Sequence, residues 1–215
     1  MNIFKPLIDF IFPPICEVCG RRLKNEEVIV CGSCIGKIVP SLTTRKRVKR
    51  LKYLDEVSAF GMFIPPFDEI IHLFKYSGKT KLSEKLVNFL YITYLTHYRD
   101  TKIDSITAVP LHRVKSRERG YNQSELLARG LSELTGIPYR PLLVRTRNTV
   151  SQTKLDRNKR MENVKGAFRC TLDVEGHVLL VDDVMTTGST LNECARVLKL
   201  NGAERVTGLV LATAD

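Results

Sequence analysis

Residues 178–190 of the chain read VLLVDDVMTTGST and decide its fold class. The run VLLV is short, apolar and rich in β-branched residues, which is typical of a strand buried on both faces of a parallel sheet. Asp182 and Asp183 follow at the carboxyl end of that strand, the edge at which open α/β sheets bind ligands. Apolar residues at helical spacing then begin at Leu191. We therefore predict an α/β fold with a parallel sheet and a ligand site at this strand end.

Five small residues separate the aspartates from the predicted helix: Thr186, Thr187, Gly188, Ser189 and Thr190. A loop of this composition directs hydroxyls, backbone N–H groups and the positive end of a helix dipole at an anion. The paired carboxylates before it repel a phosphate, so they suit sugar hydroxyls or a divalent cation instead. Together, the aspartate pair and the hydroxyl-rich loop predict a site for a ribose phosphate.

The stretch resembles the signature with which type I phosphoribosyltransferases bind 5-phosphoribosyl 1-pyrophosphate (PRPP), and Met185 lies within it. A Walker A loop is excluded, because no lysine follows Gly188. The alternative is a buried strand, an acidic turn and a capped helix that bind no ligand. The resemblance implies that Asp182 and Asp183 hold the ribose hydroxyls, directly or through Mg²⁺. It also implies that residues 186–190 bind the 5-phosphate.

The composition is that of a folded, basic protein. Of the 215 residues 43% are hydrophobic, enough for a core, and 34 Lys+Arg against 23 Asp+Glu give a net charge of +11. Such a charge favours phosphates or nucleic acid as partners without choosing between them. The apolar start of the chain is broken by Lys5, Pro6, Asp9, Pro13 and Pro14, so we predict neither a membrane span nor a signal peptide. We expect a cytoplasmic protein.

Two CxxC pairs near the N-terminus comprise Cys16, Cys19, Cys31 and Cys34. In a chain without a secretion signal, paired CxxC motifs favour a metal over disulfides. Four thiolates complete the tetrahedral coordination of Zn²⁺ and leave no open position, so the zinc is predicted to be structural. Redox chemistry at the cysteine pairs is the alternative. We predict a zinc ribbon within residues 1–44 that folds only with its metal, which can contribute on the order of 10 kcal/mol.

Basic residues then cluster in two segments. The first forms a predicted linker over residues 45–56, which is either a solvated connection or a contact for a nucleic-acid backbone; it contains Arg45, Lys46, Arg47, Lys49 and Arg50. The second, residues 140–160, carries seven basic residues and one acidic residue. Because the sequence has little apolar periodicity between Thr149 and Asn163, we predict a long polar loop there, which in a compact domain is typical of a lid or a disordered segment.

Residues 57–215 are predicted to form the α/β domain. Its other strands are expected at residues 57–64, 105–110 and 206–212, and one helix at residues 81–97. A helix N-capped by Asp68 precedes the turn KYSG at residues 75–78.

A further helix is predicted to begin at Asn122, with Glu125 completing a capping box. Leu127, Leu131 and Leu134 form its apolar stripe, and Gly136 ends it. Alternation of strands and helices predicts parallel pairing with right-handed crossovers.

Five segments, in order, resemble the ComF family. They are the paired CxxC motifs, the turn KYSG, the segment VPLHR…RGYNQSELLARGL, the segment RTRNTVSQTKLDRNKRMENVKGAF and the PRPP signature. The resemblance covers nearly the whole chain. It implies a type I phosphoribosyltransferase-like domain, with an N-terminal zinc ribbon, in a bacterial protein linked to natural competence. It further implies PRPP, single-stranded DNA and other DNA-uptake proteins as partners.

If the protein is an enzyme, the implied reaction is displacement of pyrophosphate from C1 of PRPP. Lys75, His112 and Arg113 are expected to bind PRPP, the last two beside its pyrophosphate, although His112 is equally well explained as an ordinary loop residue. Arg160 is expected to act in catalysis, closing as part of a lid with Arg157 and Lys159. No motif identifies the acceptor. The alternative function is a non-enzymatic, zinc-dependent single-stranded DNA-binding accessory protein of transformation.

Overall fold

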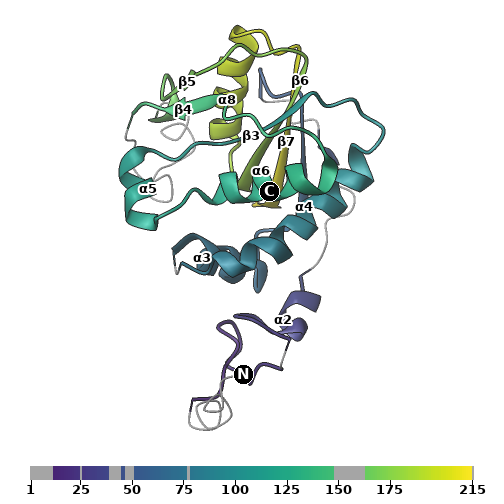
Figure 1. Ribbon diagram of the computed structural model, residues 1–215, viewed down its shortest axis with the longest axis vertical. Coiled ribbons are helices and arrows are strands. Elements are labelled where there is room, and N and C mark those ends of the chain that lie inside the picture. Colours follow the sequence, from purple (N-terminus) through teal and green to yellow (C-terminus); the bar gives the residue numbers. More distant parts are fainter. Residues whose placement is uncertain are drawn as a thin grey trace.

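A computed structural model of the chain has a parallel sheet at its centre (Figure 1). The structure describes residues 12–24, 26–38, 45–46, 51–76, 78–147 and 163–214. The sheet has the strand order β1-β2-β7-β6-β3. Its parallel strands are β2 (Glu56–Met62), β7 (Arg205–Thr213), β6 (His177–Met185) and β3 (Ser105–Ala108), while β1 (Arg45–Lys46) pairs antiparallel with β2. The predicted α/β fold class is therefore confirmed.

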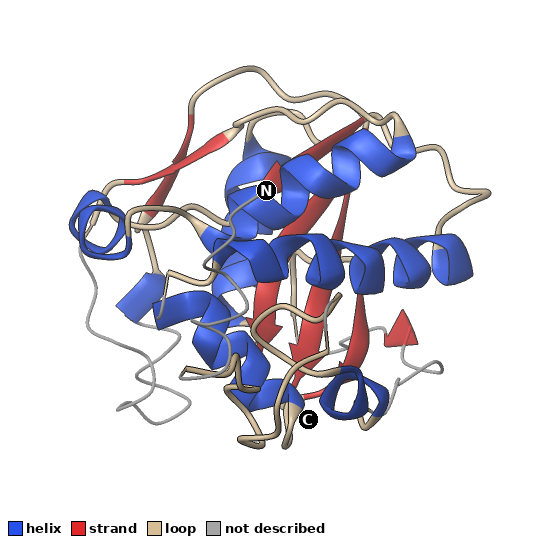
Figure 2. Ribbon diagram, turned by 60° about the horizontal axis from the view of Figure 1, so that its bottom comes forward, coloured by secondary structure: helices blue, strands red, loops and turns tan. Residues whose placement is uncertain are grey.

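Helices cover both faces of this sheet, as Figure 2 shows in blue around the red strands. α3 (Phe67–Tyr76), α4 (Ser83–His97) and α6 (Gln123–Thr135) contribute to one buried core, and α8 (Ser189–Leu200) to the other. Side chains of a strand point alternately to its two faces. Leu179 and Val181 of β6 accordingly enter the first core, and Val178 and Leu180 the second. This two-sided burial explains why residues 178–181 are continuously apolar.

Two details of the predicted helices are wrong. α3 begins at Phe67, so Asp68 lies in its first turn rather than at the N-cap; its Oδ1 accepts a 2.7 Å hydrogen bond from the Glu69 N–H. The backbone closes the turn one residue earlier, where Phe67 N–H donates to Ile64 O at 2.9 Å. In α6, the predicted apolar stripe is one residue too long. Leu134 is 44% exposed, and the last buried residue of the helix is Leu131.

The start and end of α6 agree with the sequence. The Asn122 side chain caps the helix by accepting a hydrogen bond from Ser124 N–H at 3.2 Å, and Gly136 ends it with a φ of 73°. The predicted capping box is not formed by Glu125, whose carboxylate instead pairs with Arg129 at 2.8 Å. The N-terminus of α6 is thus fixed by a single side-chain cap.

A second, two-stranded sheet was not predicted. It pairs β4 (Leu143–Arg145) antiparallel with β5 (Phe168–Cys170), on either side of the predicted polar loop. Three short helical segments also escaped prediction: α2 (Gly32–Gly36), η1 (Thr80–Leu82) and α5 (Arg113–Arg119). Within the described part of the chain, no helix has the length and apolar character that crossing a bilayer requires.

Candidate functional site

The paired aspartates lie at the carboxyl end of β6. This strand runs on to Met185, so both aspartates belong to its last residues instead of following it. Asp182 Oδ1 accepts two hydrogen bonds, from Ser124 Oγ at 2.7 Å and from Asp183 N–H at 2.9 Å. Ser124 belongs to the first turn of α6 and was not among the predicted site residues. The sequence signal that could have identified Ser124 is its position two residues after the helix cap Asn122.

Lys75 reaches the same strand end from the last turn of α3. Its Nζ lies 2.9 Å from Asp183 Oδ1, with both side chains largely buried. Two side chains before and in α6 hold this turn of α3 in place: Gln123 Nε2 donates to Lys75 O at 3.0 Å, and Tyr121 OH donates to Phe74 O. The segments KYSG and RGYNQ, which the sequence shows only as separate motifs, therefore form one contact.

Arg119 reinforces this contact. Its Nη1 donates to Gln123 Oε1 at 3.2 Å, and its guanidinium lies 4.5 Å from the centre of the Tyr76 ring. A cation is attracted to the face of an aromatic ring, so this contact strengthens the packing of Arg119 against the end of α3. The last turn of α3 is thus connected to α6 by a hydrogen bond and to α5 by a cation–π interaction.

The surroundings of Asp182 alter its pKa. Burial and the neighbouring charge of Asp183 together raise the pKa of Asp182 to about 7, against the opposing effects of Ser124 and Lys75. A buried carboxylate beside another carboxylate favours uptake of a positive charge, either a proton or a metal ion. The strand end is therefore suited to a cation.

The hydroxyl-rich loop follows directly and leads into α8. Gly188 N-caps this helix with a φ of 73°, in the left-handed region that favours glycine. Thr187 Oγ1 lies 2.8 Å from Ser189 Oγ and accepts from Ser189 N–H at 3.4 Å. The loop surrounds a small hollow that Asp182 and Met185 also line, together with Thr186, Thr187, Gly188, Ser189 and Thr190. The structure thus brings the predicted phosphate loop beside the predicted aspartate.

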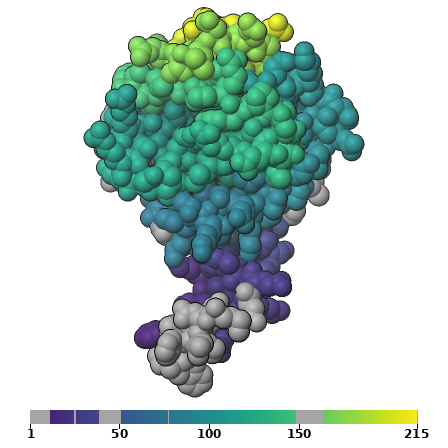
Figure 3. Space-filling model, in the orientation of Figure 1, coloured from purple at the N-terminus to yellow at the C-terminus, as the bar shows by residue number. Residues whose placement is uncertain are grey.

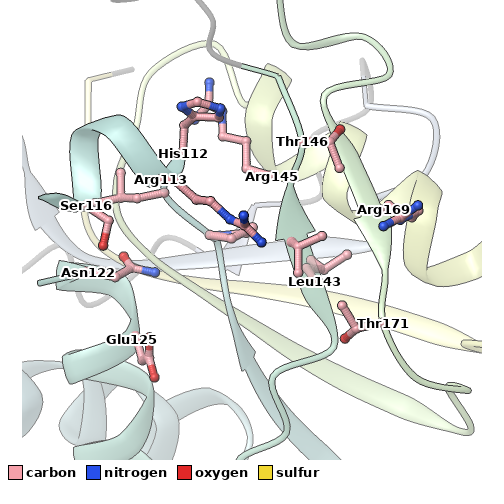
Figure 4. Close-up of a pocket in the computed structure, with 13 residues that line it drawn as sticks. His112, Arg113, Ser116, Asn122, Glu125, Leu143, Arg145, Thr146, Arg169 and Thr171 are labelled. Atoms are coloured by element: carbon pink, nitrogen blue, oxygen red, sulfur yellow. The ribbon is translucent and has the colours of Figure 1, made fainter.

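His112 and Arg113 line a second, larger pocket (Figure 4). His112 also has a structural role, because its Nδ1 accepts from Val114 N–H at 3.4 Å and caps α5. Across the pocket lie Arg145 of β4 and Arg169 of β5, neither of which was a predicted site residue. Arg160, like Arg157 and Lys159, falls outside the described residues.

The four N-terminal cysteines come together in a compact cluster. Their Sγ atoms all lie within 4.8 Å of one another, with Cys16 and Cys34 3.9 Å apart and Cys19 and Cys31 3.7 Å apart. These distances exceed a disulfide bond of about 2.05 Å. They agree with the separation of about 3.8 Å between two thiolates in a tetrahedral zinc site with 2.3 Å bonds. The cluster could therefore hold a metal ion such as zinc.

The surroundings of the cluster favour a thiolate at Cys16, whereas burial and the neighbouring thiols raise the pKa of Cys34. Cys16 Sγ accepts a 3.3 Å hydrogen bond from Cys31 N–H. Burial alone would raise the pKa of Cys16. The hydrogen bond from Cys31 N–H and other backbone hydrogen bonds outweigh burial and lower the pKa to about 6.

The ribbon lies next to α3 and α4 in Figures 1 and 3, and its Glu17 pairs with Lys79 Nζ at 2.7 Å. This ion pair connects the ribbon to the segment after α3, and buried ribbon residues such as Cys16 and Val30 belong to the same apolar core as Phe74 of α3.

Two residues of the predicted nucleic-acid segment lie within the described part of the chain. Arg45 and Lys46 form the short edge strand β1, while Arg47, Lys49 and Arg50 lie outside the described residues. The assignment of this segment to nucleic acid therefore stays a prediction.

A parallel sheet with a carboxylate pair at one strand end, followed by a hydroxyl loop that opens a helix, defines a protein of the phosphoribosyltransferase class. Residues 108–214 match the family model described as "Phosphoribosyl transferase domain". The chain is 33% identical over 198 residues to "DNA utilization protein YhgH" of Salmonella typhimurium, covering 89% of this chain and 87% of the relative. The chain belongs to the ComF family.

A further curated relative and a solved structure are also similar to this chain. "Competence protein F" of Haemophilus influenzae is 32% identical over 201 residues, or 90% of this chain and 82% of that protein. Among solved structures, a purine phosphoribosyltransferase from Pyrococcus horikoshii aligns with 60% of this chain and 74% of its own, at 20% identity and a TM-score of 0.39.

Proposed function

We propose that the chain binds PRPP together with Mg²⁺ and transfers its phosphoribosyl group to an acceptor. The observation that carries this proposal is the position of Asp182 and Asp183, at the strand end that leads into the hydroxyl loop and α8. The carboxylates suit the ribose hydroxyls and a hard divalent cation, and the loop suits a phosphate. Both halves of one ligand are therefore recognised at a single edge of the sheet.

Each residue has a distinct role in this proposal. Asp182 and Asp183 hold the ribose hydroxyls, directly or through Mg²⁺. Thr186, Thr187, Gly188, Ser189 and Thr190 bind the 5-phosphate, with Met185 next to them. Mg²⁺ supplies neutralisation of the diphosphate charge when it is bound. Lys75, His112 and Arg113 complete the PRPP contacts, and the catalytic role of Arg160, which is outside the described residues, stays a prediction.

The chemistry demands little covalent participation by the protein. The bond between C1 and the diphosphate oxygen breaks, the diphosphate leaves with the electron pair, and the acceptor nucleophile forms the new bond to C1. Because the transition state is oxocarbenium-like, positioning of the two reactants and exclusion of water account for most of the rate gain. The locked contact between Lys75, Asp183 and Gln123 provides such positioning on the protein side.

We propose Zn²⁺ as the ion in the cysteine cluster, in a structural role. Cys16, Cys19, Cys31 and Cys34 supply four sulfur ligands at the spacing that tetrahedral zinc requires. All four positions are then taken by protein, which leaves no site for a substrate.

Calorimetric titration of PRPP with Mg²⁺ tests the transferase proposal. The wild-type protein should show one saturable site, and the double variant Asp182→Asn/Asp183→Asn should lose it. Asp100→Asn makes the same chemical change at an exposed carboxylate that pairs with Arg99 at 3.8 Å, and should bind like the wild type. Failure of folded, zinc-loaded wild-type protein to bind Mg²⁺-PRPP would overturn the proposal.

A second candidate function is binding of single-stranded DNA. It is favoured by the net charge of +11, by the basic run at residues 45–50, and by relatives whose names refer to DNA utilization and competence. Replacing the five basic residues of that run by glutamine should lower the salt dependence of single-strand binding, because fewer counterions are released. An unchanged salt dependence would exclude this run as the DNA contact.

A further inference from the structure

The ribbon packs directly against the α/β domain. Its buried residues Cys16, Val30 and Cys34 belong to the same apolar cluster as Phe74 of α3 and Leu82 of η1. Figures 1 and 3 show the ribbon next to α3. Because α3 ends directly before the turn that leads into η1, the ribbon is packed against both sides of that turn.

Glu17 adds a polar contact between the ribbon and the domain. It lies between Cys16 and Cys19 in the first CxxC pair, and its Oε1 is 2.7 Å from Lys79 Nζ. The two side chains are 38% and 33% exposed, so the pair is screened by water and adds little to stability by itself. Its importance is its position, because a side chain between two metal ligands keeps its place only while the loop around the metal is folded.

One short turn joins this contact to the aspartate site. Lys79 follows Lys75 by four residues, and Lys75 Nζ lies 2.9 Å from Asp183 Oδ1. The first lysine of the turn is therefore ion-paired to the end of β6, and the last one to the ribbon. A change at the ribbon end alters how firmly the other lysine is held at the aspartates.

The size of this effect is limited by a second support of α3. Gln123 Nε2 donates to Lys75 O at 3.0 Å, so α6 holds the end of α3 independently of the ribbon. Exposed ion pairs typically change an equilibrium by up to about fivefold. Loss of the contact between Glu17 and Lys79 should therefore weaken the aspartate site without abolishing it.

Building on the proposed PRPP site, we infer that the ribbon regulates this site. The folded, zinc-loaded ribbon places Glu17 on Lys79, and this contact holds Lys75 at Asp183. Glu17 and Lys79 are thus positioning residues that act through Lys75. Coupling between two binding equilibria is reciprocal. The zinc-loaded protein therefore binds Mg²⁺-PRPP more tightly than the metal-free protein, and the protein with Mg²⁺-PRPP bound holds zinc more tightly by the same factor.

Calorimetry on the full-length, zinc-loaded chain tests the contact. Glu17→Gln and Lys79→Gln should each bind Mg²⁺-PRPP about two- to fivefold more weakly than the wild type. The double variant should bind no more weakly than either, because both changes remove the same interaction. Glu26→Gln, exposed in the ribbon, and Lys81→Gln, exposed in η1, are matched controls that should bind like the wild type.

The zinc dissociation constant is a readout that a purely structural role of the ion pair would leave independent of PRPP. It is measured by competition with a chelator of known zinc affinity, at fixed Mg²⁺, with and without saturating PRPP. PRPP should lower it about two- to fivefold in the wild type. Glu17→Gln should lose most of this effect, and it also controls for zinc that PRPP itself binds in solution. Lys79→Gln repeats the measurement with the ribbon sequence unchanged.

Three results would overturn the inference. They are equal Mg²⁺-PRPP affinities of wild type and Glu17→Gln, additive losses in the double variant, and a wild-type zinc dissociation constant that PRPP leaves unchanged. Failure of zinc-loaded wild-type protein to bind Mg²⁺-PRPP is a different result, which overturns the proposed function. The connection is then measured with Lys75→Gln, which should raise the zinc dissociation constant at least about twofold. An unchanged constant in that variant would overturn the inference as well.

Discussion

Lys75 Nζ lies 2.9 Å from Asp183 Oδ1, joining the last turn of α3 to the end of β6. The ammonium group neutralises one carboxylate of a pair that would otherwise carry two negative charges side by side. It also brings together three elements, because Lys75 O accepts from Gln123 at the start of α6. The turn KYSG is therefore part of the aspartate site rather than a surface connection.

Loss of this ion pair should destabilise the protein. The Lys75 and Asp183 side chains are 20% and 11% exposed, so the pair lies between a surface and a buried salt bridge. We expect Lys75→Gln to lower the free energy of unfolding by about 1–3 kcal/mol at pH 8. Urea unfolding measures this, with Lys81→Gln at an exposed position of η1 as the control. Equal stability of the two variants would contradict the structural importance of the contact.

The raised pKa of Asp182 predicts how the stability of the Mg²⁺-free protein depends on pH. Burial and Asp183 raise its pKa to about 7, so the folded state holds this proton more tightly than the unfolded state, where the ordinary value is 3.8. The contribution of Asp182 to stability is therefore most favourable below pH 4, declines as the pH rises to about 7, and is constant above that.

Asp182→Asn should abolish this penalty while keeping an Oδ1 acceptor for Ser124. We expect the variant to be more stable than the wild type by about 2–4 kcal/mol at pH 8 and to lose this advantage towards pH 4. Unfolding curves at several pH values measure the difference. A difference between variant and wild type that does not change with pH would show that Asp182 titrates normally.

The sequence was sufficient to predict the central sheet, because the signals are local. Residues 178–181 are continuously apolar since β6 is buried on both faces, and Asn122 and Gly136 mark the two ends of α6. The cysteine spacing likewise predicted a cluster that the structure assembles within 4.8 Å. In each case, the pattern that predicts the structure lies within one short segment of the sequence.

The remaining features depend on contacts between distant segments. β4 and β5 have three residues each and pair across the segment of residues 148–162, so neither has a periodicity of its own. Arg145 and Arg169 face one pocket only through that pairing. The contact of Lys75 with Asp183 similarly requires α3, α6 and β6 to be placed in space. A single sequence contains no signal for such pairings.

Gly188 should be required for phosphate binding beyond its effect on stability. Its φ of 73° is strained for any residue with a Cβ, and an added Cβ would lie 2.6 Å from Leu51 Cδ1. Gly136 provides a matched control, since its φ is also 73° and an added Cβ would have no neighbour within 4 Å.

Alanine at either glycine should cost about 1–2 kcal/mol of stability. Gly188→Ala should in addition weaken Mg²⁺-PRPP binding at least about tenfold, whereas Gly136→Ala should bind normally at a temperature where both are folded. Calorimetry on the two variants measures this. Equal PRPP affinities would exclude the loop at Gly188 from the binding site.

The cysteine cluster should determine the folding of the ribbon separately from the sheet. Its buried residues are few (Cys16, Val30, Cys31, Cys34 and Ile38), so apolar burial alone is too small to fold this segment. Metal binding, on the order of 10 kcal/mol, is large enough to do so. Cys19→Ser should therefore lose bound zinc and the protection of backbone amides in residues 16–38 against hydrogen exchange.

The same variant should keep the protection of β6 and β7, because α3, α4, α6 and α8 supply most of the side chains in their cores and the ribbon adds to one core only. Cys170→Ser, at a half-buried cysteine of β5 far from the cluster in sequence, should retain zinc and both sets of protected amides. Elemental analysis and hydrogen exchange with mass spectrometry measure the two effects. Protected amides in residues 16–38 of metal-free Cys19→Ser would mean that the ribbon folds without the ion, and that the four cysteines have another role.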